Sequence, residues 1–246
     1  AMSNPDINLF RDEEFEEVKL TPEKVVCLGM EFESEDARRA YFREELRKKL
    51  PELRQIEGFP IGEDEDIINL SDPPYYTACP NPWLNDFVAE WEKEKVELER
   101  QGKRSAEFVK NEPYSYPIQE KKNNPIYNAH SYHTHVPPEV IMNYYLYYTQ
   151  PGDIILDNFA GTGMEGVAAN YCSHPTKEQL KNFTERWLHN FAVKPSWGNR
   201  NCILGDLSPI ASYITYNYCN SIDVNLFKEA ANHLFDLLEN EFGHLY

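Results

Sequence analysis

The sequence has no hydrophobic run long enough to cross a bilayer and no signal-peptide pattern at its start. It also has no CxxC pair, because its five cysteines stand apart at positions 27, 79, 172, 202 and 219. Scattered cysteines without metal-ligand spacing are typical of proteins in a reducing compartment. These absences argue against a membrane protein and a disulfide-stapled secreted domain. They predict a cytoplasmic protein that has no metal site.

Basic residues are scarce, since 24 Lys and Arg stand against 41 Asp and Glu and give a formal net charge of −17. The acids crowd into the first part of the chain, in the runs RDEEFEEV, MEFESED and GEDEDI. Proteins that grip a nucleic-acid duplex normally present a basic surface, because neutralised phosphates supply much of the affinity. The sequence therefore predicts no duplex-binding surface within this chain. It also predicts an acidic surface that suits a basic protein partner.

The most informative stretch covers residues 151–169, PGDIILDNFAGTGMEGVAA, which reads as a strand, a glycine-rich turn and the start of a helix. The apolar run at residues 154–156 is typical of an inner parallel strand that is covered on both faces. Asp157 ends this run, and Gly161, Thr162 and Gly163 let the backbone turn sharply. Such a turn places free backbone N–H groups and a helix N-terminus at the carboxyl edge of a sheet, where nucleotide-like ligands bind.

The residues around the turn narrow the class of ligand. No Lys-Ser or Lys-Thr follows the glycines, which argues against a phosphate-cradling loop. The Asp157 carboxylate would repel a pyrophosphate, so a dinucleotide is disfavoured although the glycine spacing fits one. A second strand is predicted at residues 202–207, CILGDL, and its Asp206 stands where an acid takes the hydroxyls of a ribose. Two acids around a glycine turn together suit a cationic nucleoside such as S-adenosylmethionine.

Three motifs of this chain resemble those of the DNA amino-methyltransferases. DNFAGTGMEGVAA followed by GNRNCILGDLSP is similar to the cofactor-binding motifs, and HSYHTHVPPEVI is similar to the motif that lines the methionine end of the cofactor. Upstream, Asp72, Pro73, Pro74 and Tyr75 match the catalytic tetrapeptide of the family. The resemblance is closest to the N-terminal, cofactor-binding part of long multi-domain adenine-specific DNA methylases, which implies DNA methylation in a restriction-modification setting.

The resemblance implies a Rossmann-like α/β methyltransferase fold, which can be incomplete in this chain, with a helical N-terminal extension. It also implies S-adenosylmethionine as the cofactor, and as the target the exocyclic amine of DNA adenine at N6, or of cytosine at N4 as the second choice. The implied cofactor-binding residues are Tyr132, His133, Thr134, Asp157, Phe159, Gly161, Thr162, Gly163 and Asp206. Because the chain is acidic, DNA contacts would come from missing sequence or from a partner subunit.

The tetrapeptide would act on a poor nucleophile, because the lone pair of a base amine is delocalised into the ring. Hydrogen bonds from that amine to the Asp72 carboxylate and the Pro73 carbonyl would favour the reactive, pyramidal nitrogen, and Tyr75 would stack on a flipped base. Two alternatives to this catalytic role stay open. In the first, the segment is simply a turn. In the second, Asp72 shapes the site and a second tetrapeptide further downstream carries out catalysis, as in the long methylases.

The order of helix and turn signals predicts three segments. Residues 1–66 form an acidic helical extension, residues 67–125 hold the tetrapeptide, a helix and a linker, and residues 126–246 form the cofactor-binding domain. Helices are predicted over residues 34–49 (ended by Pro51), 82–101, 138–147, 209–218 and 227–242, and from a capping box at Thr176 and Gln179. Residues 67–70 predict a strand that leads into the tetrapeptide. The last helix is expected to turn Leu234, Leu237, Leu238 and Phe242 inward.

Two other functions stay open. The chain can be a non-catalytic cofactor-binding or interaction module whose acidic surface docks a basic partner. It can also be a methyltransferase that acts on RNA or on a small molecule, and a small-molecule substrate suits the acidic charge. His130, His133 and His135 suggest a metal ion, but they have no cysteine or carboxylate companions, and the methyltransferase motif explains them without one.

Overall fold

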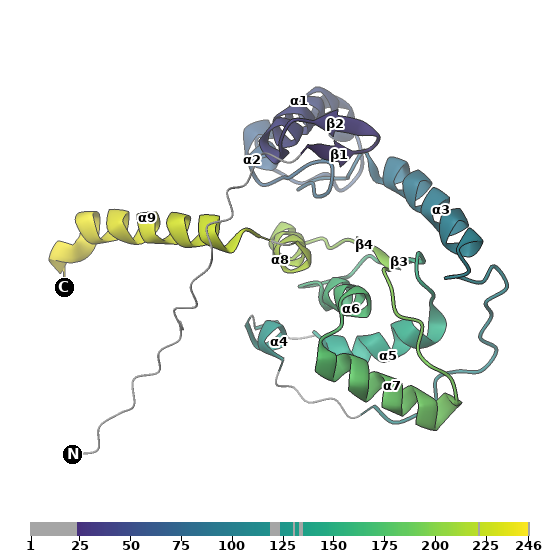
Figure 1. The fold of residues 1–246 in the computed structure, drawn as a ribbon. Helices are drawn as coiled ribbons and strands as arrows, with labels where there is room; N and C mark the ends of the chain where they lie inside the picture. The colour runs from purple at the N-terminus through teal and green to yellow at the C-terminus, as the bar shows by residue number, and fades with distance from the viewer. Residues whose placement is uncertain (1–23, 119–123, 130, 133–134, 221, 246) are drawn as a thin grey trace, which may run out of the picture.

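The structure is a computed structural model that describes residues 24–118, 124–129, 131–132, 135–220 and 222–245. Figure 1 shows a mixed α/β chain that is mainly helical. The strands in these ranges form two small sheets of two strands each. Their buried apolar side chains form two separate clusters, one within residues 27–83 and one within residues 142–187. The chain therefore has an N-terminal unit and a C-terminal unit, each with its own core.

The N-terminal unit begins with a hairpin that the sequence did not predict. Strands β1 (Val25–Cys27) and β2 (Met30–Phe32) pair antiparallel, and helices α1 (Glu35–Leu53), α2 (Asp64–Asn69) and α3 (Leu84–Arg100) follow. The predicted cap of α1 is confirmed, because the Ser34 hydroxyl accepts a hydrogen bond from the Ala37 N–H at 3.1 Å. The buried face of α1 repeats every four residues, through Arg38, Phe42, Leu46 and Leu50.

The prediction that Pro51 ends the first helix is wrong, because α1 continues to Leu53. Proline removes its own N–H and crowds the carbonyl four residues earlier, but the helix still closes beyond it, since the Arg54 N–H donates to the Leu50 carbonyl at 2.9 Å. Leu50 and Leu53 are both buried in the N-terminal core. Their burial stabilises the last turn beyond the proline.

The predicted strand at residues 67–70 is also wrong, because Ile67 and Ile68 belong to α2. Three acids, Asp64, Glu65 and Asp66, occupy the first turn of this helix, where the partial positive charge of the helix end favours them. The two isoleucines are buried on the same core as α1. This core therefore includes residues on both sides of the domain boundary predicted at residue 66.

The C-terminal unit confirms the predicted strand, turn and helix of residues 151–169. Its elements are α4 (Pro125–Ala129), α5 (Pro138–Tyr148), β3 (Ile154–Asp157), α6 (Met164–Ser173), α7 (Lys177–Phe191), β4 (Asn201–Leu204), α8 (Pro209–Cys219), α9 (Val224–Phe242) and the short 3-10 helix η1 (Gly243–Leu245). The capping box of α7 is present, since the Gln179 N–H donates to the Thr176 hydroxyl at 3.2 Å and the Gln179 side chain accepts from the Thr176 N–H at 3.0 Å.

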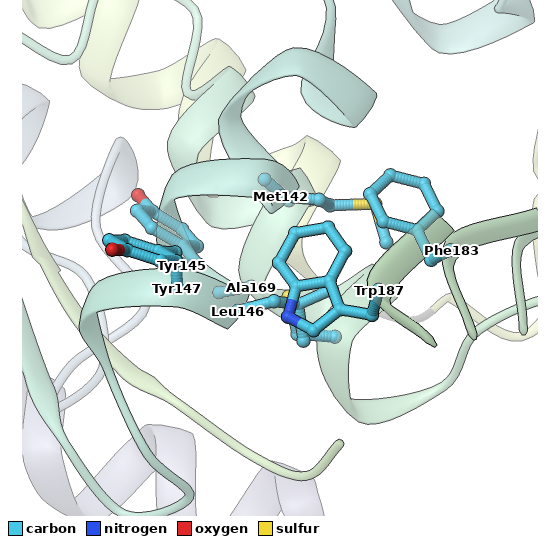
Figure 2. Packing of buried hydrophobic residues seen from close by; sticks show 9 residues of the cluster. Met142, Tyr145, Leu146, Tyr147, Ala169, Phe183 and Trp187 are labelled. Carbon is cyan, nitrogen blue, oxygen red and sulfur yellow. The ribbon is translucent and has the colours of Figure 1, made fainter. Parts of the chain in front are cut away.

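The core of the C-terminal unit lies where α5, α6 and α7 meet. Figure 2 shows Met142, Tyr145 and Leu146 of α5 packed with Phe183 and Trp187 of α7. Trp187 is 3% exposed and Phe183 is 2% exposed. The helix inserted between the two strands therefore packs mainly on its own unit, as its apolar stripe predicts.

The predicted Rossmann-like fold is not confirmed, because the described residues hold one parallel pair of strands and no complete parallel sheet. β3 pairs with β4, and the register joins Ile154 to Asn201 and Asp157 to Leu204. The expectation that this strand is covered on both faces is wrong, because Leu156 is 62% exposed. Burial of an inner strand requires layers on both sides of the sheet. The described chain supplies such packing mainly on the side of α5 and α6.

The last long helix is amphipathic, but its apolar side does not face the core. Figure 1 shows α9, in yellow, extending away from the rest of the chain. The predicted inward residues are exposed, at 56% for Leu234, 51% for Leu237, 43% for Leu238 and 42% for Phe242. The periodicity correctly predicted a helix, whereas its packing depends on tertiary contacts that periodicity does not specify.

Polar contacts near the start of β3 attach the segment after α3 to the C-terminal unit. The Arg104 guanidinium donates to the Asp153 carboxylate at 2.5 Å, and the Gln150 amide donates to the Ser105 carbonyl at 2.8 Å. Gly152 lies against α3, because a Cβ at this position would be 2.8 Å from the Leu98 side chain. The end of α3 is thereby fixed beside β3. None of the helices in the described ranges is both long and apolar enough to span a membrane.

Replacing Trp187 by alanine is expected to lower the free energy of unfolding by about 3–5 kcal/mol, because a large buried side chain leaves a cavity. Leu188→Ala is the matched control on the same helix, since Leu188 is 45% exposed, and it is expected to cost about 1 kcal/mol or less. Urea unfolding followed by circular dichroism measures both. Equal losses in the two variants would contradict this packing of α7.

Candidate functional site

The two predicted acids lie at the same edge of the parallel pair. Asp157 is the last residue of β3 and is in register with Leu204, the last residue of β4. Asp206 follows Leu204 by two residues. Because parallel strands end at the same edge of a sheet, this arrangement brings both carboxylates beside the glycine turn, as the sequence predicts.

The glycine turn has the backbone that only glycine adopts readily. Gly161 and Gly163 have φ values of 54° and 77°, in the left-handed region. A Cβ at Gly161 would lie 2.8 Å from the Tyr132 ring. The structure therefore brings Tyr132 onto the turn, and it buries Thr162 there. His133 and Thr134, which were predicted to bind the cofactor together with Tyr132, lie outside the described residues.

The two acids accept hydrogen bonds from backbone N–H groups of the loops at this edge. The sequence predicted that such N–H groups would be free. The Asp206 carboxylate accepts one hydrogen bond from the Gly161 N–H at 3.0 Å and another from the Ser208 N–H at 2.8 Å. Asp157 accepts from the Phe159 N–H at 2.8 Å through one oxygen. Its other oxygen receives no hydrogen bond from the described part of the chain. Asp157 thus keeps a carboxylate oxygen for a ligand.

Glu165 is a further acid at this edge that the sequence analysis did not single out. It lies in the first turn of α6, directly after the glycines. Burial raises the pKa of its carboxyl group, and the nearby Asp157 carboxylate raises it further. The sequence could have indicated Glu165, because it lies at the predicted start of a helix and close to Asp157. The edge therefore concentrates negative charge, which favours a cationic ligand.

A cavity of about 600 Å³ opens between the two units, within the usual size range of small-molecule sites. Asn158, Gly205 and Asp206 line it from the edge of the parallel pair. Tyr75 and Tyr76 line it from the N-terminal unit. The cavity therefore joins Asp206 to the tetrapeptide residue Tyr75, whereas Asp157 and the glycine turn are not among its lining residues. Phe159 is 82% exposed and is not among the residues that line this cavity.

A buried arginine donates hydrogen bonds to the tetrapeptide. Arg38 of α1 is 1% exposed, and its guanidinium donates to the Asp72 carboxylate at 2.8 Å and to the Pro73 carbonyl at 2.6 Å. Arg39 also donates to Asp72, at 3.2 Å, and the Tyr216 hydroxyl of α8 donates to its other oxygen. The two acceptors that were predicted to hold a target amine are thus both engaged by Arg38.

These partners stabilise the negative charge of Asp72. Burial alone would raise the pKa of the carboxyl group, but the hydrogen bonds from Tyr216 and Arg38 hold it below its ordinary value. Burial, followed by the contact with Asp72, raises the pKa of the Tyr216 hydroxyl. Asp72 is therefore an ionised and fully partnered acid at neutral pH, in contact with both units.

The other tetrapeptide residues are packed around Arg38. Pro73 and Pro74 are buried, and Tyr75 is 46% exposed. The Arg38 guanidinium lies 4.7 Å from the centroid of the Tyr75 ring, in cation–π geometry. The sequence does hold a signal for Arg38, because it falls on the four-residue repeat of buried positions in α1. Tyr216 gave no such signal, because nothing in the sequence distinguishes it from the other two tyrosines of α8.

Comparisons with protein-family models, with curated proteins and with solved structures found no match. The described residues hold no group of three or more His, Cys, Asp or Glu side chains that could bind a metal ion. Of the three histidines considered for such a site, His130 and His133 lie outside the described residues. The function is therefore argued from the geometry of the site alone.

Replacing Arg38 by methionine is expected to lower the free energy of unfolding by about 3–5 kcal/mol, because it removes one partner of a buried ion pair. Arg39→Met is the matched control, since Arg39 also contacts Asp72 but its side chain is 45% exposed, and it is expected to cost less than about 1 kcal/mol. Denaturant unfolding measures both variants. Similar values would show that the buried contacts of Arg38 do not stabilise the fold.

The stabilising effect of the Asp72 charge is expected to disappear in acid. Its pKa is lowered by folding, so its contribution is complete above the ordinary aspartate pKa of about 3.9 and is lost as the pH falls through the folded-state value. The difference in unfolding free energy between wild type and Asp72→Asn should therefore shrink below about pH 4. Asp36→Asn is the control, because this side chain is 95% exposed. A difference for Asp72→Asn that stays constant with pH would contradict the role of its charge.

Proposed function

We propose that this chain binds S-adenosylmethionine at the carboxyl edge of β3 and β4, as the cofactor-binding part of a DNA amino-methyltransferase. Adenine N6 is the first expected target and cytosine N4 the second. One observation carries the proposal most directly. Asp157 ends β3 and Asp206 follows β4 by two residues, both beside a left-handed glycine turn, and Asp206 lines a cavity of about 600 Å³.

The chemistry of the edge supports a cationic nucleoside. S-adenosylmethionine carries a sulfonium and an ammonium group, and the free oxygen of Asp157 and the nearby Glu165 are suited to such charges. Tyr132 lies on the glycine turn, where an aromatic ring can contact a cation. Asp206 is placed to accept hydrogen bonds from ribose hydroxyls, because each carboxylate oxygen accepts more than one. These contacts support the cofactor and do not by themselves identify the methyl acceptor.

The tetrapeptide supports a positioning role better than a catalytic one. In this arrangement Arg38 donates to the Asp72 carboxylate and to the Pro73 carbonyl, and these were the acceptors expected for a base amine. For Asp72 to hold a target amine, Arg38 and Tyr216 would have to release it. We therefore propose that Asp72 shapes the site while a residue elsewhere in the complete enzyme holds the target base.

The same observation favours a second candidate, a non-catalytic module that binds the cofactor. This candidate shares the cofactor site and lacks only the transfer step. Transfer of labelled methyl groups to DNA, after the chain is combined with a subunit that recognises DNA, would support the methyltransferase and exclude the non-catalytic module. Transfer to RNA or to a small molecule in place of DNA would identify the third alternative.

Calorimetric titration with S-adenosylmethionine and S-adenosylhomocysteine tests the cofactor site. Asp157→Asn is expected to weaken S-adenosylmethionine by about tenfold and the uncharged thioether less, because one charge pair is worth ~1–4 kcal/mol near a protein surface. Asp206→Asn should weaken both ligands alike, because the ribose is common to them. Glu178→Gln, an exposed acid on α7, is the control for loss of charge. A folded wild-type chain that binds neither ligand would contradict the proposal.

A further inference from the structure

Helix α9 has an apolar side that no element in the described part of the chain buries. Figure 1 shows the helix projecting away from the rest of the chain, and none of its residues is buried. Its large apolar side chains are 42–70% exposed, and they are Val224, Leu226, Phe227, Leu234, Phe235, Leu237, Leu238 and Phe242. This apolar side is therefore open to a partner.

The apolar residues of α9 lie together on one half of the helix. At about 3.6 residues per turn, Phe227 and Leu234 fall at the middle of this side. Leu226 and Phe235 fall at its two borders. The opposite half is polar and mainly acidic, and it holds Asn225, Glu229, Asn232, Asp236 and Glu239. Of the acids of α9, only Glu241 lies on the apolar side, in the last turn, so the middle of this side is free of charge.

Packing has to supply much of the stability of α9. The helix contains three asparagines and three phenylalanines, which are weaker helix formers than alanine. Most of the stability of helices in proteins comes from the packing of an amphipathic face, since helices isolated in water are marginal. A partner that covers the apolar side would supply this missing packing.

The apolar side has the size of one half of a stable protein interface. Eight large side chains that are about half exposed offer on the order of 800 Å² of apolar surface, and each partner contributes about 800 Å² to an interface of standard size. Ala230 and Ala231 lie among these large side chains and leave a depression on the helix surface. A large side chain of a facing helix can pack into such a depression.

Electrostatics favours an antiparallel pair of α9 helices over a parallel one. The chain carries a net charge of −17, so two copies repel each other when they lie close together. The rest of the described chain precedes α9, and an antiparallel pair places these two bodies at opposite ends of a helix of about 28 Å. This separation is larger than the Debye length of about 8 Å at physiological ionic strength, so the repulsion is largely screened.

The position of Glu241 favours the same orientation. In an antiparallel pair, the last turn of one helix lies beside the first turn of the other, where the partial positive charge of the helix end favours an acid. In a parallel pair, the two Glu241 carboxylates would lie side by side and repel each other.

We propose that α9 pairs antiparallel with α9 of a second copy of this chain and forms a homodimer. Such an interface is isologous, because the same apolar side is used by both copies, and its centre falls near Leu234. The surface is separate from the carboxyl edge of β3 and β4 and from the cavity beside it. The inference therefore does not rest on the function proposed above.

Sedimentation equilibrium of the whole chain tests the dimer. The wild type is expected to show twice the mass of the chain at about 100 µM protein, because interfaces of this size give dissociation constants in the micromolar range or tighter. Leu234→Lys should raise the dissociation constant by about a hundredfold or more, since it removes a buried leucine and places a charge in the interface. Circular dichroism checks that each variant is folded.

Asn232→Lys is the matched control, because it adds the same charge to the polar half of the same helix. It should change the dissociation constant by less than about threefold, as expected for a substitution outside an interface. A monomeric wild type at this concentration would overturn the proposal. A dimer that Leu234→Lys weakens no more than Asn232→Lys does would overturn it as well.

Small-angle X-ray scattering of the dimer tests the orientation of the helices. The antiparallel pair is expected to give an elongated particle with two separated bodies, whereas a compact particle with adjacent bodies would exclude this orientation. Raising the salt concentration should strengthen the dimer, because it screens the repulsion between the two acidic chains. An association that salt weakens would instead depend on ion pairs and contradict an apolar interface.

These results are separable from the test of the cofactor site, because both variants lie outside the edge of β3 and β4. A dimer that depends on Leu234 in a chain that does not bind S-adenosylmethionine would support the interface while the proposed function fails. A monomeric wild type that binds S-adenosylmethionine in a manner that depends on Asp157 would do the reverse.

Discussion

The ion pair between the buried Arg38 guanidinium and Asp72 is the interaction on which the contact between α1, the tetrapeptide and α8 depends. A charge that is 1% exposed must be paired, and Arg38 is paired with the Asp72 carboxylate and the Pro73 carbonyl. The same carboxylate receives the Tyr216 hydroxyl of α8. One acid therefore joins the first helix, the tetrapeptide and the C-terminal unit. The cavity lies beside this junction, with Tyr75 and Tyr76 on one side and Asp206 on the other.

The tetrapeptide has the residues that the resemblance requires, but its acceptors are not available to a target base. In the resemblance, the Asp carboxylate and the first Pro carbonyl of Asp-Pro-Pro-Tyr accept hydrogen bonds from the target amine. In this fold both acceptors are satisfied from within the protein, and the exposed part of the segment is the ring of Tyr75. The glycine turn differs, because it keeps the close backbone approach that a ligand requires and an oxygen of Asp157 that is still available. The geometry therefore supports cofactor binding more strongly than methyl transfer by Asp72.

Local signals in the sequence predicted local structure well. The cap at Ser34, the capping box at Thr176 and the strand, turn and helix of residues 151–169 depend on neighbouring residues, and all are present. The parallel pairing that brings Asp157 and Asp206 to one edge is a long-range contact, but the order of strand, helices and strand along the chain was enough to predict it.

The wrong predictions concern contacts that neighbouring residues do not determine. Ile67 and Ile68 are typical of a strand, but three preceding acids and burial against α1 favour a helix. The exposure of Leu156 and of the apolar side of α9 depends on which elements cover them. For the candidate site, the sequence located the acids and glycines, whereas the pairing of Asp72 with Arg38 and Tyr216 arises only from the tertiary fold.

The hydrogen bond from the Gly161 N–H to Asp206 has a consequence for the glycine turn. The carboxylate that would receive sugar hydroxyls is also the group that holds the glycine turn. The position of the glycine turn therefore depends on the side chain of a residue that lies 45 positions later in the sequence. A change at Asp206 would act on the turn as well as on the loop that carries Asp206.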